Sequence, residues 1–557
     1  MKHNLEQLVV LIIDAHPGMR AQLRSMLDSF GVAHIHHAVS AGDAVRKLRE
    51  RRFDLILCAY DLGDNAQDGQ HLLEDLRQRK LIPLDAVFIM ISGERAYERV
   101  VGAAELAPND YILKPLTPGS LFDRLQRALA KRAAFRPIWQ LMAENLPEAA
   151  IDEITHAQLA HPAHYTELLR LRAELLLGTG RRDEAEAAYR DIIAARPLPW
   201  ARLGLARTLF ARQAHDEAET VLTALIDESE HYLDARDLLA RVREAQGKLA
   251  SARHTLAQAL ERSPHRLSRL RSFGEIAMKS GALEEAETAQ TTVVEKGKRS
   301  EFGEAEDHLR LIRTQLQRQR TAAAATTLED LTRTRGHQPS APVCIALGEA
   351  LLARSEGRPA DARAAARRAA TLATSTRGLS LELRHATLSC CLENGLTDEG
   401  STLTTHLLRT AEDENAIART RAVLEAHGAE ALSRSIEQQL HAEVKEYIAA
   451  GARSVQAGDY DTAVSDMMNA VRRMPGNAHV LFNAALALLR HIEHAGWNER
   501  FARQAHALLM RTRRLDPTNP RLDAIERFLH SMLHKYGIQA EAFARKQPAR
   551  PASRPAV

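Results

Sequence analysis

The chain has 557 residues, more than one hydrophobic core usually organises, so we expect three or four units or a long repeat array. Hydrophobic residues make up 45% of the chain and charged residues 26%, whereas aromatic residues are only 4%, which is typical of soluble, helix-rich proteins. The net charge of +3, from 75 basic and 72 acidic residues, is too balanced to predict nucleic-acid binding.

The amino-terminal part of the chain alternates short apolar runs with amphipathic helical stretches. Runs of strand length that end in polar residues occur within Val9–Arg20, Phe53–Leu62, Val87–Glu94 and Asp110–Pro115, and a shorter run covers His34–Ala38. Helical patterns lie between them, over Arg20–Phe30, Ala41–Arg51, Gly69–Arg79, Tyr97–Leu106 and Leu121–Lys131. This alternation predicts an α/β fold with a doubly wound, five-stranded parallel sheet, whose chemistry lies at the carboxyl ends of the strands.

The residues at these strand ends resemble the receiver domain of bacterial two-component response regulators. Asp14 ends the first run, and Ser92 precedes Lys114 and Pro115 by 22 and 23 positions. The resemblance implies a site in which two adjacent acidic residues and a phospho-accepting Asp hold one magnesium ion. It also implies a Ser or Thr on the fourth strand and a Lys–Pro pair after the fifth, and Ser92, Lys114 and Pro115 fit those positions.

Two residues depart from that pattern. Ala15 stands at the second acidic position, and Ala59 stands where the phosphorylated Asp is expected, 45 positions after Asp14. Alanine offers neither a nucleophilic oxygen nor a metal ligand. We therefore expect a pseudo-receiver in which phosphorylation at the usual site is excluded, magnesium binding is lost or weak, and Lys114 pairs with Asp14. The alternative is a displaced acceptor among the acidic residues that follow, namely Asp61, Asp64 and Asp68.

Tyr111, three positions before Lys114, matches an aromatic residue that receivers use in their output face. That face comprises the fourth and fifth helices with the fifth strand, and it implies binding of a partner or of a second copy of the chain. Three histidines, His34, His36 and His37, lie on the second predicted strand. Since alternate residues of a strand face opposite ways, they indicate an exposed edge and not a metal site.

Beyond the receiver-like part, the sequence becomes helical and self-similar. Similar segments begin at Gly180, Gln213, Gly247 and Gly281, at intervals of 33 to 34 residues. They resemble the tetratricopeptide repeat, in which a helix, a tight turn and a second helix recur and stack into an all-α solenoid. The residues expected at the turns and at the packing positions are Gly180, Ala185, Tyr189, Ala218, Gly247, Ala252, Gly281, Ala286, Gly458 and Ala463.

The resulting domain organisation has six segments. We expect a receiver-like domain over 1–131, a helical joint over 132–147, tetratricopeptide repeats over 148–300, degenerate helical repeats over 301–440, a C-terminal repeat with capping helices over 441–540, and a disordered tail over 541–557. The tail is rich in Pro and Arg and poor in apolar residues, which is the basis for expecting disorder there.

The repeat resemblance implies a groove that binds partner proteins. Residues expected to line it lie on the first helix of each repeat: Arg170, Glu174, Arg202, Arg207, Arg236 and Arg243. Because arginine dominates this set, an acidic or phosphorylated partner is the working hypothesis.

No catalytic motif stands beside these features. The sequence has no GxSxG, HExxH or GxxxxGK[ST] pattern, and its four cysteines lack CxxC spacing, so we expect no enzyme activity and no metal site. The first residues lead directly into a strand, and no apolar window reaches 18 residues, so we expect a cytoplasmic protein without a signal peptide or membrane span.

These observations favour a non-enzymatic signal-transduction adaptor of the two-component type, with a receiver that lacks its acceptor and a solenoid that binds other proteins. One alternative is a phosphorylation-switched response regulator that uses a displaced acceptor such as Asp61. Another is a scaffold or assembly chaperone. Transcriptional control is disfavoured, because no helix-turn-helix pattern or basic face stands out.

Overall fold

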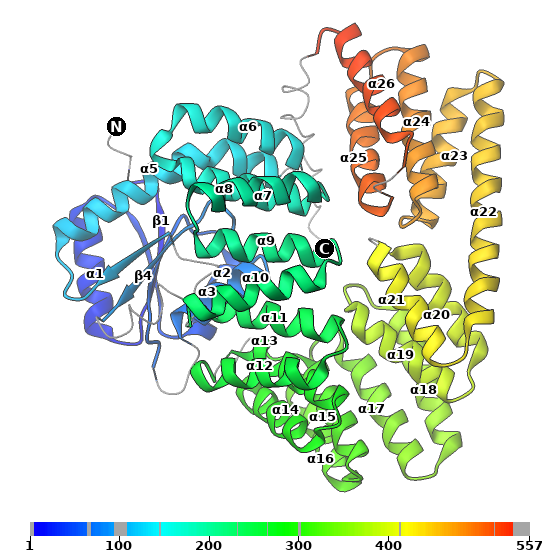
Figure 1. Ribbon diagram of the computed structural model, residues 1–557, viewed down its shortest axis with the longest axis horizontal. Helices are drawn as coiled ribbons and strands as arrows, with labels where there is room; N and C mark the ends of the chain where they lie inside the picture. The colour runs from blue at the N-terminus through cyan, green and yellow to red at the C-terminus, as the bar shows by residue number, and fades with distance from the viewer. Residues whose placement is uncertain are drawn as a thin grey trace, which may run out of the picture. The chain divides into compact units, whose positions relative to one another are not determined.

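The computed structural model describes residues 5–63, 68–93, 109–143, 146–230, 232–264, 266–298, 302–411, 414–516 and 519–538. The chain forms two compact units, Met1–Asp307 and His308–Val557. The first unit contains a parallel sheet followed by helix pairs, and the second contains helices throughout its described part (Figure 1).

The sheet has five strands: β1 (Val9–Ile13), β2 (His34–Ala38), β3 (Leu55–Ala59), β4 (Val87–Ser92) and β5 (Asp110–Leu113). All neighbouring pairs are parallel, and the strand order is β2-β1-β3-β4-β5. The central strands β3 and β4 are buried along their whole length, because helices cover both faces of the sheet. The predicted doubly wound parallel sheet is confirmed.

Four described helices belong to this layer: α1 (Pro17–Ser29), α2 (Ala41–Glu50), α3 (Gly69–Gln78) and α5 (Pro118–Ala143). One face of the sheet packs with α1 and α5, and the other packs with α2 and α3. The predicted helix over 97–106 lies outside the described residues. The carboxyl ends of the strands and the start of α3 therefore lie at the same edge of the sheet, and the candidate site lies at this edge.

The fifth helix differs from its prediction. It continues past Lys131, where the sequence predicted a helix end and a separate joint over 132–147, and Pro137 lies within it. The predicted joint is therefore helical as far as Ala143 but continuous with the fifth helix, because packing against α6 (Pro147–Ala160) outweighs the backbone hydrogen bond that a proline removes. The buried side chains on both sides of the proline are Phe135, Ile138 and Leu141.

After α6, the first unit is a series of helix pairs. A single 3-10 turn at Pro162–His164 precedes them, and the helices are α7 (Tyr165–Gly178), α8 (Arg182–Ala195), α9 (Pro199–Ala211), α10 (His215–Glu228), α11 (Leu233–Ala245), α12 (Leu249–Arg262), α13 (Leu267–Lys279) and α14 (Leu283–Lys298). Each helix packs on the next, and α9 also contacts α7 and α11. We call this series the first array. It confirms the predicted helical solenoid.

The turns within these pairs need a left-handed backbone. Gly180, Gly247 and Gly281 have φ angles of 83°, 76° and 79°, and Gln213 takes the same position at 63°. Glycine reaches this region without steric cost, which is why it marks three of the four turns. The small residues predicted for the packing positions are fully buried, and they are Ala185, Ala218, Ala252, Ala286 and Ala463.

Tyr189 shows how the first two repeats interlock. Its side chain is 2% exposed, and a Cβ atom at Gly204 would lie 2.3 Å from the ring. Position 204 on α9 must therefore be glycine for the ring on α8 to fit.

The remaining helices are α15 (Ala305–Gln317), α16 (Thr321–Arg335), α17 (Ala341–Ser355), α18 (Pro359–Ser375), α19 (Leu381–Glu393), α20 (Thr397–Thr410), α21 (Glu414–Ala426), α22 (Glu430–Gln456), α23 (Tyr460–Arg473), α24 (Ala478–Ala495), α25 (Glu499–Leu515) and α26 (Leu522–Lys535). Within the described ranges, no helix is both long and apolar enough to cross a membrane. The predicted tail over 541–557 lies outside these ranges.

The region predicted as degenerate repeats has a regular period of its own. Left-handed turn residues occur at Gly281, Gln319, Gly357 and Gly395, which are each 38 positions apart in sequence. Helices α16, α17 and α18 have 15, 15 and 17 residues, whereas most helices of the first array have 13 or 14. The repeat is longer by about one helical turn.

Candidate functional site

The carboxyl edge of the sheet brings together the residues predicted for the receiver site. Asp14, Ser92 and Ala59 are 1%, 1% and 3% exposed. One oxygen of Asp14 accepts a hydrogen bond from the backbone N–H of His16 at 2.8 Å. The other oxygen is 4.0 Å from Lys114 Nζ and has no hydrogen-bond partner within the described ranges. The predicted pair of Asp14 and Lys114 is therefore a long one.

Alanine at position 59 leaves backbone and not carboxylate at the end of β3. The amide of Gly69, the first residue of α3, donates to the carbonyl oxygen of Tyr60 at 2.7 Å. A Cβ atom at Gly69 would lie 2.3 Å from the carbonyl oxygen of Ala59, so α3 begins directly against the strand. A larger side chain at Gly69 would therefore push the start of α3 away from the end of β3.

The residues at this edge do not fit a magnesium ion held as the receiver resemblance implies. Asp14 is the one carboxylate that the described strand ends supply. Asp61 is exposed and accepts a hydrogen bond from the backbone N–H of Gly63 at 2.9 Å, and Asp64 lies outside the described residues. No group of three or more His, Cys, Asp or Glu side chains within the described ranges could hold a metal. A single carboxylate with one distant lysine is a poor octahedral donor set.

The third candidate acceptor, Asp68, has a structural role. Its carboxylate caps α3 by accepting from the backbone N–H of His71 at 2.8 Å, and it also lies 2.9 Å from Nδ1 of the His71 ring. Such a cap satisfies a backbone donor that the helix itself cannot. The Asp68 carboxylate is therefore already engaged, by the backbone of α3 and by the His71 ring.

Helix α3 has two distinct faces. Its leucines are fully buried against the sheet, and they are Leu72, Leu73 and Leu76. Its other side presents His71, Glu74 and Arg77 at helical spacing toward the first array. The same helix thus packs on the sheet with one side and contacts the repeats with the other.

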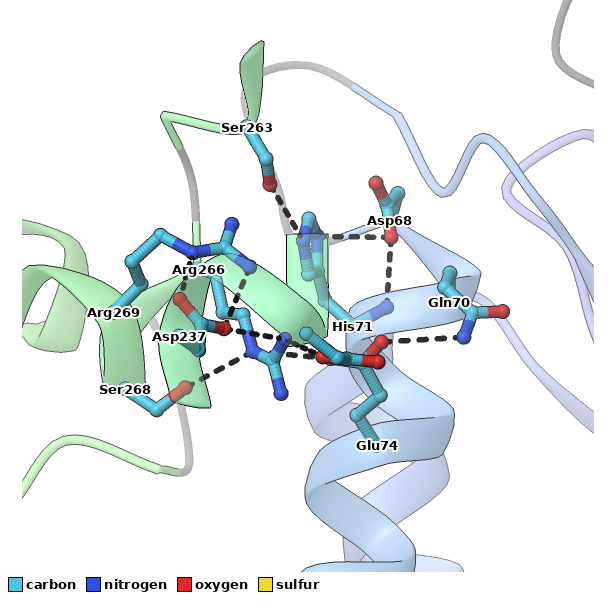
Figure 2. Close-up of polar contacts among 10 residues, drawn as sticks. Asp68, Gln70, His71, Glu74, Asp237, Ser263, Arg266, Ser268 and Arg269 are labelled. Atoms are coloured by element: carbon cyan, nitrogen blue, oxygen red, sulfur yellow. Dashed lines mark hydrogen bonds and ion pairs between the residues drawn. The ribbon is translucent and has the colours of Figure 1, made fainter. Parts of the chain in front are cut away.

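Figure 2 shows this contact. Glu74 Oε2 lies 3.3 Å from Arg266 Nε, and the ring of His71 lies 3.4 Å from the hydroxyl of Ser263. Ser263 is the C-cap residue of α12 and Arg266 is the N-cap residue of α13, so both lie where these two helices are joined. We call this group the α3–array contact. It comprises Glu74 and His71 of α3 and, from the array, Ser263, Arg266, Arg269, Asp234 and Asp237.

Arg266 is held in place by carboxylates of α11. Its Nη1 atom donates to Asp234 Oδ1 at 2.8 Å and to Asp237 Oδ2 at 3.3 Å. Arg269, 2% exposed, donates through Nε and Nη2 to both oxygens of Asp237 at 2.7 and 2.8 Å. This fork-like pairing fixes the guanidinium groups in space.

A second anchor lies just beyond α3. Arg79 donates to the carbonyl oxygen of Phe302 at 3.1 Å and to Glu304 Oε1 at 2.6 Å, and its guanidinium lies 5.1 Å from the centre of the Phe302 ring. Phe302 is 1% exposed and packs into the apolar core of the receiver face that carries α3. The receiver therefore also packs against Phe302, which follows the first array, and against Leu267 of α13.

Tyr111 connects the sheet to this contact. Its hydroxyl donates to Gln70 Oε1 at 2.9 Å, and Gln70 Nε2 donates to Glu74 Oε1 at 3.2 Å. From Tyr111, β5 leads to Lys114, which a cis peptide bond joins to Pro115. The aromatic residue predicted for an output face thus reaches the array through α3, whereas the predicted fourth helix lies outside the described part.

Burial and charge shift several pKa values in the contact. Burial alone would lower the pKa of His71, but Asp68 and Glu74 outweigh it and raise this pKa. Burial raises the pKa of Glu74, although Arg266 and His71 oppose the rise. Burial also lowers the pKa of Arg77, and the positive charge of Arg170 lowers it further. The contact holds protons on His71 and Glu74 more firmly than water does.

Most of the arginines predicted to line a partner groove have partners inside the array. Arg202 pairs with Glu228 at 2.5 Å and Arg243 with Glu219 at 2.9 Å, and Arg236 is buried. Burial makes Arg236 an unsuitable groove residue, whereas a groove role for Arg202 and Arg243 stays a prediction. The other three predicted groove residues are Arg170, Glu174 and Arg207; Arg170 pairs with Glu174 at 2.7 Å.

The sequence analysis missed the α3–array contact, although part of its pattern was visible. Asp234 and Asp237 are three residues apart, as are Arg266 and Arg269, and the two pairs are 32 positions apart, close to one repeat. Such matched charges indicate pairing between equivalent helices of neighbouring repeats. Nothing in the sequence indicated that Glu74 would join them.

Comparison with known families agrees with this architecture. Residues 10–126 match the family described as "Response regulator receiver domain". This part of the chain is a receiver domain. Residues 170–232 and 238–299 match the family described as "Tetratricopeptide repeat", and this part consists of such repeats.

The similar proteins described next each match part of this chain. Transcriptional regulatory protein ZraR of Salmonella typhimurium is 31% identical over 125 residues, which are 22% of this chain and 26% of ZraR. Chemotaxis protein CheY-3 of Vibrio cholerae is 26% identical over 125 residues, 22% of this chain and 92% of CheY-3. A solved tetratricopeptide repeat protein from Parabacteroides merdae is 13% identical, covers 46% of this chain and 97% of its own, and has a TM-score of 0.35. This chain spans about a quarter of ZraR.

Proposed function

We propose that the protein is a non-enzymatic signalling adaptor of the two-component type. In this proposal the receiver domain takes no phosphoryl group at its usual position, binds no magnesium there, and serves as a fixed docking element. The tetratricopeptide repeats bind partner proteins, and the protein works in the cytoplasm.

One observation carries the proposal: Ala59 ends β3 at 3% exposure, beside Asp14 as the one described carboxylate of that edge. Aspartyl phosphorylation requires a carboxylate oxygen to attack phosphorus and a divalent cation to neutralise the phosphoryl oxygens. A methyl group at position 59 supplies neither. Lys114 is left with Asp14 at 4.0 Å as its counter-charge.

The α3–array contact supports the adaptor role. In it, Glu74 of the receiver pairs with Arg266 of the first array, and Arg79 of the receiver donates to Phe302, which follows that array. A receiver with a fixed chemical state and a direct contact to a protein-binding array is suited to hold that array in one arrangement.

The test is phosphorylation of the purified full chain with acetyl phosphate and magnesium, read by intact mass. We expect no mass increase of one phosphoryl group, while a receiver with an intact acceptor, treated in parallel, gains one. A stoichiometric adduct on this chain would overturn the proposal.

A displaced acceptor is the second candidate, and the exposed carboxylate of Asp61 is the observation that favours it. Asp68 is the weaker choice because it caps α3. If an adduct forms, the Asp61→Ala variant identifies the site: loss of the adduct assigns it to Asp61 and makes the protein a phosphorylation-switched regulator.

A further inference from the structure

The first helices of the 38-residue repeats, α15, α17 and α19, line a cavity of about 370 Å³ in the second unit. Each helix contributes the same positions of its repeat to this cavity. Among the lining residues, Arg313, Leu351 and Ser389 lie one repeat apart, as do Gln317, Ser355 and Glu393. The cavity is therefore built from one face of each of the three helices.

The buried part of this cavity is apolar. Leu309, Leu347 and Cys390 line it and are 5%, 1% and 3% exposed, and the half-buried side chains of Leu316 and Leu351 line it as well. Burial raises the pKa of the Cys390 thiol to about 11, so the thiol is neutral. A large apolar side chain that entered this cavity would be removed from water, which is favourable.

An ion pair lies toward each end of the cavity. Arg310 of α15 donates to both carboxylate oxygens of Glu382 on α19, at 3.2 and 2.7 Å, and Glu382 lies one helical turn before the lining residue Ala386. At the other end, Arg354 of α17 pairs with Glu393 of α19. These pairs connect the three helices around the cavity.

The charges around the cavity are mainly positive. Burial would raise the pKa of Glu382, but Arg310, Arg313 and Arg419 of α21 outweigh burial and lower this pKa. Arg313 and Arg419 are exposed, and neither forms an ion pair within the described ranges. Of the charged groups that line the cavity or act on Glu382, four are guanidinium groups, and with Glu382 itself there are two carboxylates. The rim of the cavity therefore carries guanidinium charge that is not neutralised.

We propose that this cavity binds a segment of a partner protein that carries a carboxylate close to a large apolar side chain. The apolar side chain enters the cavity, and the carboxylate pairs with Arg313 at the rim. An acidic segment is favoured because it balances the excess of guanidinium charge, and because arginine binds carboxylates in a forked geometry. The inference rests on the proposed function in one respect, namely that the helical part of the chain binds partner proteins, and it assigns such binding to helices beyond the first array.

The probe is a phage-displayed library of random short peptides, selected on the immobilised full chain. Before each round, the library is depleted on the Ser389→Trp variant, in which an indole ring occupies the cavity. This step removes peptides that bind elsewhere on the protein. Enriched peptides are then synthesised with a fluorescein label, and fluorescence anisotropy gives their affinities.

We expect the enriched peptides to combine Asp or Glu with a large apolar residue a few positions away. They are expected to bind the Arg313→Glu variant at least tenfold more weakly than the unmodified chain, and a peptide whose acidic residue is replaced by lysine should regain affinity for that variant. The matched control is Arg377→Glu, because Arg377 is an exposed arginine that follows α18 and does not line the cavity. This control should leave the affinities unchanged.

Two results would overturn the proposal. A selection that enriches no peptide after depletion would remove the site. Enriched peptides that lack an acidic residue, or that bind the Arg313→Glu variant as tightly as the unmodified chain, would contradict the chemistry assigned to the partner.

A second depletion variant covers the case in which Ser389→Trp lowers the urea midpoint. The double variant Arg313→Glu and Arg419→Glu then takes its place, because both side chains are exposed. In that case replacing the apolar residue of an enriched peptide by alanine must weaken binding at least tenfold, and an unchanged affinity contradicts the proposal. A phosphoryl group on the receiver would overturn the adaptor proposal without altering these results, so the two proposals can fail separately.

Discussion

The carboxyl edge of the sheet and the array-facing side of α3 are neighbours in the receiver domain, yet they differ in how many charged side chains they carry. At the edge, alanines stand at two acidic positions, and Asp14 keeps one oxygen without a hydrogen bond. On α3, Glu74 joins an ordered group of carboxylates and guanidiniums. In the described residues, the larger group of paired charges in this receiver lies at its contact with the repeats and not at its strand ends.

Restoring the edge should have the largest effect on this comparison. The double variant Ala15→Asp and Ala59→Asp returns three carboxylates to the strand ends, which is the set that an aspartyl-phosphate site with magnesium requires. We expect acetyl phosphate to add one phosphoryl group to this variant and none to the unmodified chain, as read by intact mass. The single variant Ala59→Asp is the control and should react far less, and a double variant that stays unmodified would mean that more than two residues disable the edge.

Removing the Arg266 guanidinium should have the next largest effect, and this effect is on stability. Arg266→Gln removes one guanidinium partner from Asp234 and from Asp237, and losing one partner of a largely buried ion-pair network costs about 2–3 kcal/mol. We expect a clearly lower urea midpoint for the first unit. The matched control is Arg253→Gln, because Arg253 pairs with Glu285 at 3.5 Å on an exposed part of the same array. That change should cost less than about 0.5 kcal/mol, and equal losses in both variants would contradict the special role of Arg266.

The pH dependence of the contact follows from His71. Its pKa in the folded protein is raised above the ordinary value of 6.5, so its stabilising contribution is fully present below pH 6.5 and is lost as the pH rises through the folded value. We expect the unmodified chain to lose its advantage in urea midpoint over His71→Gln between about pH 6 and pH 8. An advantage that grows over this range would show that the neutral ring is the stabilising form.

The smallest effect is expected at Asp14. In Asp14→Asn the amide oxygen can still accept from the backbone N–H of His16, and what is lost is the 4.0 Å pair with Lys114 and the charge facing the exposed His16 ring at 3.5 Å. We expect the free energy of unfolding to change by less than about 1 kcal/mol. A loss as large as that of Arg266→Gln would place an important charge at the edge after all.

Local pattern was sufficient to predict the receiver and the first repeats. The strands are short apolar runs that end in polar residues, and Asp14, Ser92 and Lys114 reach one edge because the carboxyl ends of parallel strands converge there. Glycine-marked turns and buried alanines likewise made the repeats of the first array visible.

Three features were not predicted from the sequence, because their causes lie far away in the chain or in the packing of other elements. Gln319 replaces glycine at a turn of the 38-residue repeats, so the glycine signal fails where the period also changes. The fifth helix was predicted to end at Lys131, but packing from α6 keeps α5 continuous to Ala143. Glu74 and Arg266 are far apart in sequence, and only the folded arrangement of the receiver and the first array brings them together.

The most direct test of this account is hydrogen–deuterium exchange of residues 68–80, followed in the full chain with and without acetyl phosphate and magnesium and in the Glu74→Gln variant. The account predicts that acetyl phosphate leaves exchange of α3 unchanged, whereas Glu74→Gln raises it at least tenfold. Exchange that responds to acetyl phosphate and is indifferent to Glu74→Gln would show that the strand edge, and not the α3–array contact, controls the receiver.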